Sequence, residues 1–189
     1  MTPDNETVHL VTLQIPCAKD PTATHNATFT TYGARWISWI GRNSTNQDVD
    51  VLLFYDELEG LFDVGDPAFG STIGRYANRI ANGTFKLNQP AEDGNGTVLK
   101  KYNIPLRTHH NGNTDPWSLH GVWNQKVWKI AKTDLNQEGF PFVTFSRTSP
   151  GGEHGFPATI DVRFHFSKSN IFFNHFQFSA DKIKKNQID

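Results

Sequence analysis

The sequence predicts an all-β protein in which short antiparallel strands form a sandwich. Runs rich in Val, Ile, Phe, Trp and Thr recur between Gly, Pro, Asn and Asp, and helical periodicity is scarce. The 189 residues include 15 Phe and 5 Trp, a content typical of a chain that folds around a core. Long loops at Gln89–Gly96 and Arg107–Pro116 favour a sandwich over a barrel.

The expected strands are runs of β-branched and aromatic residues between turn-forming residues. The clearest is Thr159–Phe166, where Val162, Phe164 and Phe166 alternate with polar residues and so define one buried face. In chain order, the predicted strands are His9–Ile15, Ala27–Ile40, Val49–Phe54, Thr84–Leu87, Lys101–Ile104, Val127–Lys132, Phe142–Arg147, Thr159–Phe166 and Ile171–Phe178.

Length and charge limit the domain organisation and the classes of partner. The chain is interpreted as a single domain over residues 1–189, with a poorly defined N-terminal segment over residues 1–26. Its 18 Lys and Arg against 19 Asp and Glu give a net charge of -1, which argues against nucleic acid and anionic membrane surfaces as partners. No apolar run reaches the roughly 18 residues that cross a bilayer.

The cellular compartment stays open on the sequence alone. A single cysteine, Cys17, excludes an intramolecular disulfide and a zinc site built on paired cysteines. N-x-S/T sequons occur at Asn5, Asn26, Asn43, Asn82 and Asn95, against roughly two expected by chance. The first 20 residues lack the basic start and apolar core of a secretory signal, so both cytoplasmic and secreted locations are retained.

The segment Phe69–Ala81, FGSTIGRYANRIA, departs from the strand pattern and predicts a closely packed turn or a short helix. Within it, the Asn78-Arg79 pair combines an amide with a guanidinium fork, which suits sugar hydroxyls or a carboxylate. The alternative is a structural Arg79 paired with an acid in Asp56–Glu59. The three residues Trp117, Trp123 and Trp128 could stack on sugars, but core packing is their commoner use.

Histidines supply the candidate acid–base groups. His120 lies in WSLHG after a long polar loop, where it either faces a cleft or is a hydrogen-bonded loop residue. His109 and His110 face opposite ways on an extended chain and so cannot both join His120 on one metal ion, which argues against a metal site. His165 and His175 are expected on the polar faces of strands.

Several motifs in order resemble the N-terminal part of the aldose 1-epimerases, also called galactose mutarotases. The strongest are G-R-Y-A-N-R-I (Gly74–Ile80) and, some forty residues later, S-L-H-G (Ser118–Gly121). Supporting matches are Y-G-A (Tyr32–Ala34), D-V-D-V-L-L-F-Y-D (Asp48–Asp56), L-E-G (Leu58–Gly60) and E-H-G-F-P-A-T (Glu153–Thr159). The resemblance covers about Thr28 to Ala180. The sequons and the N-G-T-F-K-L stretch also resemble fungal-type members.

The resemblance implies a galactose mutarotase-like supersandwich that interconverts the α and β anomers of free aldoses, such as galactose and glucose, without metal or organic cofactor. One group takes the proton of the anomeric hydroxyl while another protonates the ring oxygen, and the ring opens. Matching the family motifs places Asn78 and Arg79 on substrate hydroxyls. It places His120 near the ring oxygen, as an assisting catalytic and substrate-binding residue.

The resemblance also implies that groups needed for catalysis lie beyond this sequence. The family continues into an N-H-x-Y-W/F-N-L segment that carries the general acid histidine, and later to a glutamate base. His175 precedes that segment and aligns with an ordinary strand residue. We therefore expect little or no activity from the chain alone, since losing an acid or a base costs about 10²–10⁴-fold each. The alternatives are a non-catalytic carbohydrate-binding or regulatory protein and an inactive truncated family member. The oligomeric state is left open.

Overall fold

The computed structural model describes residues 1–2, 4–17, 22–63, 68–91, 95–109, 112–168 and 179–180. Its elements are mainly strands, accompanied by one short helix and two single-turn 3-10 helices. In chain order they are β1 (Leu10–Pro16), β2 (Thr24–Thr30), β3 (Arg35–Arg42), β4 (Asp48–Asp50), α1 (Gly60–Asp63), β5 (Arg79–Ala81), β6 (Thr84–Pro90), β7 (Thr97–Asn103), β8 (Trp117–Leu119), η1 (Trp123–Gln125), β9 (Lys129–Leu135), β10 (Pro141–Ser149), η2 (Glu153–Gly155), β11 (Ile160–Ser167) and β12 (Ser179–Ala180).

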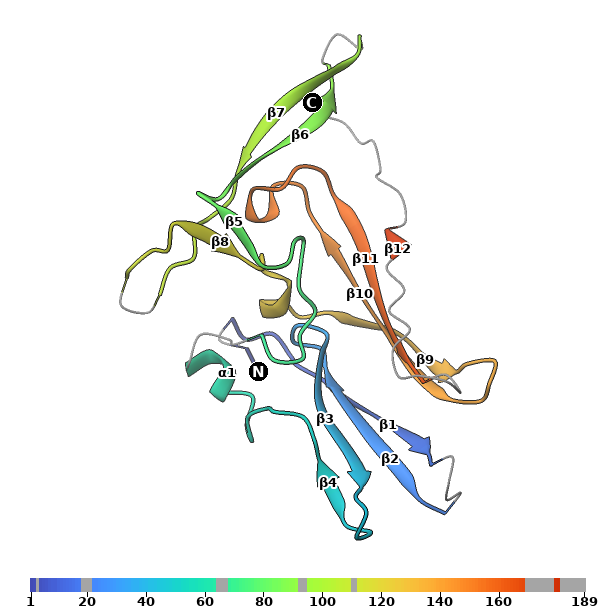
Figure 1. Cartoon of the computed structure of the whole chain (residues 1–189). Coiled ribbons are helices and arrows are strands. Elements are labelled where there is room, and N and C mark those ends of the chain that lie inside the picture. Colours follow the sequence, from blue (N-terminus) through green and yellow to red (C-terminus); the bar gives the residue numbers. More distant parts are fainter. Residues whose placement is uncertain are drawn as a thin grey trace.

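Within the described residues, the strands form two four-stranded sheets and two two-stranded ribbons (Figure 1). One sheet has the order β1-β2-β3-β4 and the other β12-β11-β10-β9, while β5 pairs with β8 and β6 with β7. All of these pairings are antiparallel. The all-β prediction is therefore confirmed.

The hydrophobic core lies between the two sheets and explains why they pack together. Phe29 of β2 reaches across to Phe166 of β11, with ring centroids 4.6 Å apart, and to Phe145 of β10. Trp123 and Trp128, both almost fully buried, meet edge to face beside this contact. Burying this apolar and aromatic area supplies the main favourable free energy of the sandwich.

The prediction of one strand over Ala27–Ile40 was wrong, because a tight turn divides it into β2 and β3. Gly33 in that turn has φ +76°, and a Cβ at this position would lie 2.6 Å from the Asn124 carbonyl oxygen. The turn residues Tyr32 and Ala34 are themselves buried, so the apolar character of a strand continues through it. Sequence pattern alone therefore could not mark the break.

Other differences concern short elements. The predicted turn over Phe69–Ala81 is present, but its last three residues form β5, and β8 was also missed. Three-residue strands are too short to show alternation. The strand predicted over Val49–Phe54 is limited to β4, and the side chain of Leu53 is exposed. The predictions over 142–147 and 159–166 correspond to β10 and β11, whereas 171–178 lies outside the described residues.

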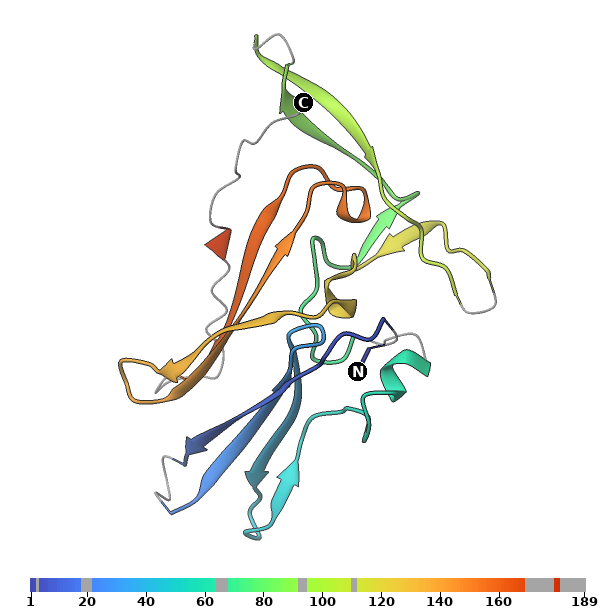
Figure 2. The ribbon, with the colours of Figure 1, turned by 180° about the vertical axis from the view of Figure 1, so that it is seen from behind.

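The β6–β7 ribbon projects from the rest of the molecule, which is clear from both sides (Figures 1 and 2). Its base is held by an aromatic stack in which Phe85 lies between Tyr102 and Phe156, with centroid distances of 5.5 and 4.8 Å. Farther out, Val98 and Leu99 are exposed. The described part of the chain contains no helix that is long and apolar enough to cross a membrane.

Candidate functional site

The segment that carries Asn78 and Arg79 is fixed on the turn between β2 and β3. The backbone N–H of Thr72 donates to the Gly33 carbonyl at 2.8 Å. Arg35, which has no exposed surface, donates from Nη1 to the Phe69 carbonyl at 3.1 Å. These two bonds tie the loop backbone to the turn and to β3, so the segment has a defined path towards β5.

Two glycines let this segment cross the one that carries His120. Gly74 and Gly121 form an isolated bridge, and Val122 N–H donates to the Gly74 carbonyl at 3.1 Å. A Cβ on Gly74 would lie 1.8 Å from the Trp123 ring, and one on Gly121 would lie 2.1 Å from the Gly74 oxygen. Only glycine allows this close approach.

A reciprocal pair of hydrogen bonds joins Asn78 to His120 where β5 and β8 meet. The pairing of Arg79 with Leu119 places the two residues next to each other at the ends of the strands. His120 N–H donates to the Asn78 carbonyl at 3.0 Å, and Asn78 N–H donates to His120 Nδ1 at 2.9 Å. Both residues have left-handed backbone conformations, with φ +65° and +62°. The structure thus brings together the three residues predicted from the motifs.

These bonds determine which nitrogen of His120 carries the proton. Because Nδ1 accepts from Asn78, the proton of the neutral imidazole is on Nε2, and Nε2–H is a donor. Within the described residues no hydrogen bond to Nε2 is found. Burial lowers the pKa of His120 below its ordinary value, and the charges of Arg79 and Arg107 lower it further. His120 is therefore a neutral Nε2–H donor at neutral pH.

Arg79 is held by a polar and an aromatic neighbour. Its Nη1 donates to Asn78 Oδ1 at 3.0 Å, and its Cζ lies 5.6 Å from the centre of the Trp117 ring. Among the described residues, which include Asp56–Glu59, no ion pair with Arg79 is found, so the structural alternative is not supported. Arg79 remains exposed, and its guanidinium has further N–H groups besides the one that bonds to Asn78.

Polar side chains beneath the cluster support it from the protein interior. Ser118, which is 1% exposed, shares a hydrogen bond with the Tyr76 hydroxyl, and the Tyr76 ring stacks on Phe156 at 5.7 Å. Arg75 donates to Ser149 Oγ at 2.8 Å, to the Ser149 carbonyl at the end of β10, and to two backbone carbonyls of the β10–β11 connection. The segment before Asn78 is thus tied to the second sheet.

Glu153 anchors the same connection. Its carboxylate accepts hydrogen bonds from Arg147, from Ser149 and, at 3.3 Å, from Trp123 Nε1. Burial alone raises the pKa of Glu153, but the bonds from Arg147 and Ser149 outweigh it and hold the pKa below its usual value. The ionised carboxylate is therefore the stable form.

The other histidines are placed elsewhere. His109 Nε2 lies 3.1 Å from Asp115 Oδ1 in the loop before β8, and His165 Nδ1 lies 3.0 Å from Thr144 Oγ1 on the sheet. His110 and His175 lie outside the described residues. Within the described ranges, no three His, Cys, Asp or Glu side chains are grouped so that they could hold a metal ion.

Arg107 is a charged residue next to β8 that the sequence did not indicate. Its N–H donates to the Trp117 carbonyl at 2.9 Å and its carbonyl accepts from Asp115 N–H at 2.9 Å, so it lies alongside β8. Its charge acts on His120. No motif marks Arg107, because only the pairing across the loop brings it beside β8.

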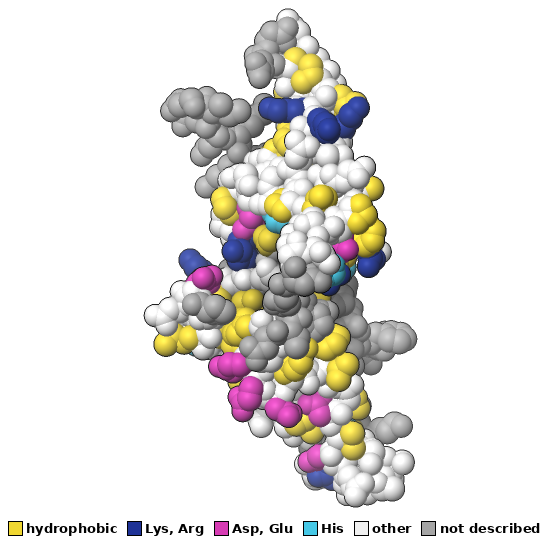
Figure 3. All heavy atoms as spheres, turned by 90° about the vertical axis from the view of Figure 1, so that its left-hand side faces the viewer, with side chains coloured by type: hydrophobic (Ala, Val, Ile, Leu, Met, Phe, Trp, Pro, Cys, Tyr) yellow, Lys and Arg dark blue, Asp and Glu magenta, His cyan; other side chains and the backbone are white. Residues whose placement is uncertain are grey.

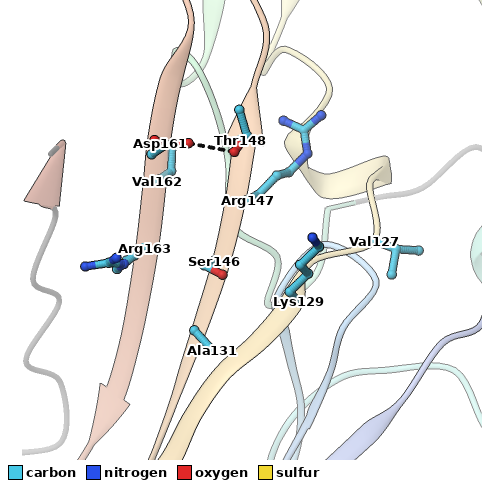
Figure 4. A pocket seen from close by; sticks show the side chains of 9 residues that line it. All are labelled: Val127, Lys129, Ala131, Ser146, Arg147, Thr148, Asp161, Val162 and Arg163. Atoms are coloured by element: carbon cyan, nitrogen blue, oxygen red, sulfur yellow. Dashed lines mark hydrogen bonds between the residues drawn. The ribbon is translucent and has the colours of Figure 1, made fainter. Parts of the chain in front are cut away.

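A separate pocket of about 550 Å³ lies on the second sheet (Figure 4). In it, Thr148 Oγ1 of β10 donates to Asp161 Oδ1 of β11 at 2.6 Å. Ser146 of β10 and Lys129 of β9 also line the pocket. None of Asn78, Arg79 and His120 lines this pocket. The candidate site is therefore the cluster at β5 and β8.

Comparisons with known proteins agree on one family. A family model described as aldose 1-epimerase matches residues 19–170. Galactose mutarotase of Bos taurus is 37% identical over 121 residues, which are 60% of this chain and 27% of that protein. Aldose 1-epimerase of Haemophilus influenzae is 29% identical over 163 residues, or 85% of this chain and 39% of that protein. A probable aldose 1-epimerase of Arthroderma benhamiae is 32% identical over 152 residues, which are 77% of this chain and 30% of that protein.

Solved structures support the fold independently. A GalM/aldose epimerase homologue from C. elegans matches with a TM-score of 0.60 and 20% identity, over 86% of this chain and 43% of that chain. Galactose 1-epimerase from Lactobacillus acidophilus matches with a TM-score of 0.56 and 16% identity, over 87% of this chain and 45% of that chain. The chain thus spans less than half the length of these relatives and structures.

Proposed function

The chain belongs to the aldose 1-epimerase family, and from this premise we propose that it binds a free aldose and acts in the interconversion of its α and β anomers. Galactose is the proposed first substrate, because several relatives are galactose mutarotases. Asn78, Arg79 and His120 are the proposed binding residues. The observation that carries the proposal is the hydrogen bond from Asn78 N–H to His120 Nδ1.

That bond gives His120 a single defined role towards the sugar. With Nδ1 occupied, Nε2–H donates outward, and the pyranose ring oxygen is an acceptor of suitable chemistry. The guanidinium of Arg79 donates to hydroxyl oxygens, while Asn78 Oδ1 and the Trp117 ring fix its orientation. A pre-oriented donor set loses less entropy on binding than free side chains would.

Anomer interconversion needs one group to remove the anomeric hydroxyl proton and another to protonate the ring oxygen. Neutral His120 would become an imidazolate if it transferred its Nε2 proton, which is unfavourable at neutral pH. We therefore assign His120 the role of polarising the ring oxygen by hydrogen bonding. Full proton transfer falls to other groups.

A second function is favoured by the composition of the cluster, namely aldose binding without turnover. In the described part of the chain, no carboxylate forms a hydrogen bond or ion pair with Asn78, Arg79 or His120. The cluster then supplies hydrogen bonds but no base for the anomeric hydroxyl. In this second role the chain acts as a carbohydrate-binding or regulatory protein.

Polarimetry on freshly dissolved α-D-galactose separates the two functions. Acceleration over the spontaneous rate that is lost in His120→Asn supports the isomerase. Saturable galactose binding by calorimetry without acceleration, again lost in His120→Asn, supports the binding protein. Arg42→Gln is the matched control, since Arg42 is an exposed arginine that pairs with Asp48 far from the cluster. The absence of both binding and acceleration would refute both functions.

A further inference from the structure

We propose that the chain associates with a second copy of itself head to tail, with the β6–β7 ribbon of one copy seated on the acidic end of the next. The acidic end is the surface formed by β4 and the segment that follows it, residues 48–59. Neither surface contains Asn78, Arg79 or His120, so this association does not depend on the proposed function.

The acidic end carries an apolar strip that continues the core-facing side of the first sheet to its edge. Val51 N–H donates to the Trp39 carbonyl at 3.1 Å, which places Val51 opposite Trp39. Because Trp39 packs against the core, Val51 and, two residues away, Val49 lie on the core-facing side. Both valines are nevertheless exposed, Val51 by 66%. A row of apolar side chains left in water is typical of an interaction surface.

A small apolar pocket adjoins this strip. It has a volume of about 270 Å³, and the rings of Trp36, Phe164 and Phe166 line it. Leu53, which is 73% exposed, lines it as well and follows the strip in the chain. Small-molecule sites measure roughly 300–1,000 Å³, so this pocket is better suited to an aliphatic side chain of a protein partner. Pockets of this kind seat the anchor residues of protein interfaces.

The outer edge of β4 does not offer a free backbone for strand addition. Asp50 Oδ1 accepts from Leu52 N–H and from Trp39 N–H, both at 3.0 Å. The Leu52 N–H is therefore already bonded and cannot pair with a further strand. The contact must be made by side chains.

Three exposed acids follow the strip, namely Asp56, Glu57 and Glu59. Among the described residues, none of the three forms an ion pair. Residues 48–59 hold five acids and no Lys or Arg. This end of the molecule therefore combines an apolar strip and pocket with an uncompensated negative charge.

The β6–β7 ribbon has the opposite charge. Lys86 and Lys101 are direct cross-strand partners, and like charges directly opposite each other destabilise a pair of strands. Lys100 is exposed next to them, and the two strands contain no acid. Glu92 and Asp93 of the connecting segment lie outside the described residues. Acids of a second copy would offset the repulsion between the two lysines.

The ribbon also supplies an apolar anchor. Leu99 is 60% exposed and lies two residues before Lys101, on the same face of the strand. We assign Leu99 to the pocket beside Leu53 of the next copy, with the lysines against the acids.

The two surfaces lie at opposite ends of the molecule. In Figure 3, Lys and Arg side chains gather towards the β6–β7 ribbon, acidic side chains gather towards the opposite end, and hydrophobic side chains lie next to both. A contact between two different surfaces is heterologous, so copies join into a ring or an open row.

Sedimentation velocity of the whole chain, from about 1 to about 200 μM, tests the association. We expect species larger than a monomer, which weaken as the salt is raised from about 50 to about 300 mM. Reversing the ribbon, in Lys100→Glu with Lys101→Glu, should weaken the association about 10-fold or more, since attraction becomes repulsion. Reversing the acidic end, in Glu57→Lys with Glu59→Lys, should do the same. Lys129→Glu, on exposed β9, is the matched control and should change nothing.

Mixing the two reversed variants adds a readout that a folding defect would not mimic. The acidic ribbon of one then meets the basic end of the other, so the mixture should regain the association that each variant has lost. Leu99→Ser changes an exposed side chain and costs little stability, yet it should weaken the association by removing the anchor.

Three results would overturn the inference. They are a chain that stays monomeric up to about 200 μM at low salt, an association that survives both charge reversals, and a mixture that regains nothing. Galactose binding by the same variants should match that of the unchanged chain, because the cluster at β5 and β8 keeps its residues. A failure of the association therefore leaves the proposed function standing, and a failure of galactose binding leaves the association standing.

Discussion

Replacing Glu153 by Gln tests whether the buried ion pair beneath the site stabilises the fold. The side chains of Arg147 and Glu153 are 12% and 11% exposed, so both charges are largely removed from water. The substitution keeps the shape of the side chain and removes its charge. It leaves the guanidinium of Arg147 without a counter-charge, next to Arg75, whose pKa is lowered first by burial and also by the charge of Arg147.

The expected cost follows from the four hydrogen bonds that the carboxylate accepts. Two come from Arg147, one from Ser149 and one from Trp123. A glutamine in place of Glu153 would offer a single acceptor oxygen and would turn its NH₂ group towards other donors. Breaking a buried pair by removing one partner costs about 3–5 kcal/mol. Because the pair keeps some exposure, we expect the lower end, about 3 kcal/mol.

Urea denaturation followed by tryptophan fluorescence measures this loss. The matched control is Asp134→Asn, which removes the partner of Lys132. Both side chains of this pair are exposed, so the substitution should lower the stability much less than Glu153→Gln does. A loss below about 1 kcal/mol in Glu153→Gln would refute the reasoning, since it would equate a buried pair with a surface pair.

Three further predictions concern the cluster and its packing. His120→Asn keeps an acceptor for Asn78 N–H and so should cost less stability than His120→Gln by about 1 kcal/mol in urea denaturation, yet it should lose galactose binding. Burial lowers the pKa of His120 and of His154, so the unfolded chain binds more protons below about pH 6.5. The free energy of unfolding should therefore be highest above about pH 6.5 and should decrease as the pH falls from there to the lowered pKa values of the two histidines. A urea midpoint that stays constant from about pH 7.5 to about pH 5 would contradict this prediction. Gly74→Ala should destabilise the fold by several kcal/mol or prevent folding, since its Cβ would meet the Trp123 ring; a soluble variant with an unchanged thermal midpoint would argue against the close crossing.

The parts of the fold that the sequence predicts are those where local pattern and burial agree. In β11, Val162, Phe164 and Phe166 alternate along the strand, as the pattern requires, and Phe166 packs against β2. The turn at Gly33 was missed because Tyr32 and Ala34 are buried by tertiary contacts inside the turn. Local pattern cannot distinguish a buried turn from a continuing strand.

The candidate site was likewise predicted only in part from the sequence. Motif matching could select Asn78, Arg79 and His120 because the side chains themselves carry the pattern. It could not predict that Arg107 lies beside β8, because a backbone pairing across a loop places it there.

The tautomer of His120 is the property on which the proposed chemistry depends most, and a backbone group determines it. The donor to Nδ1 is the N–H of Asn78, 42 positions earlier in the chain, and it is aimed by the left-handed conformations of both residues. The side chain of Asn78 meanwhile orients Arg79. One residue therefore sets the hydrogen-bonding direction of the imidazole through its backbone and the position of the guanidinium through its amide. This double role explains why a polar residue tolerant of the left-handed region fits position 78 better than an apolar one of the same size.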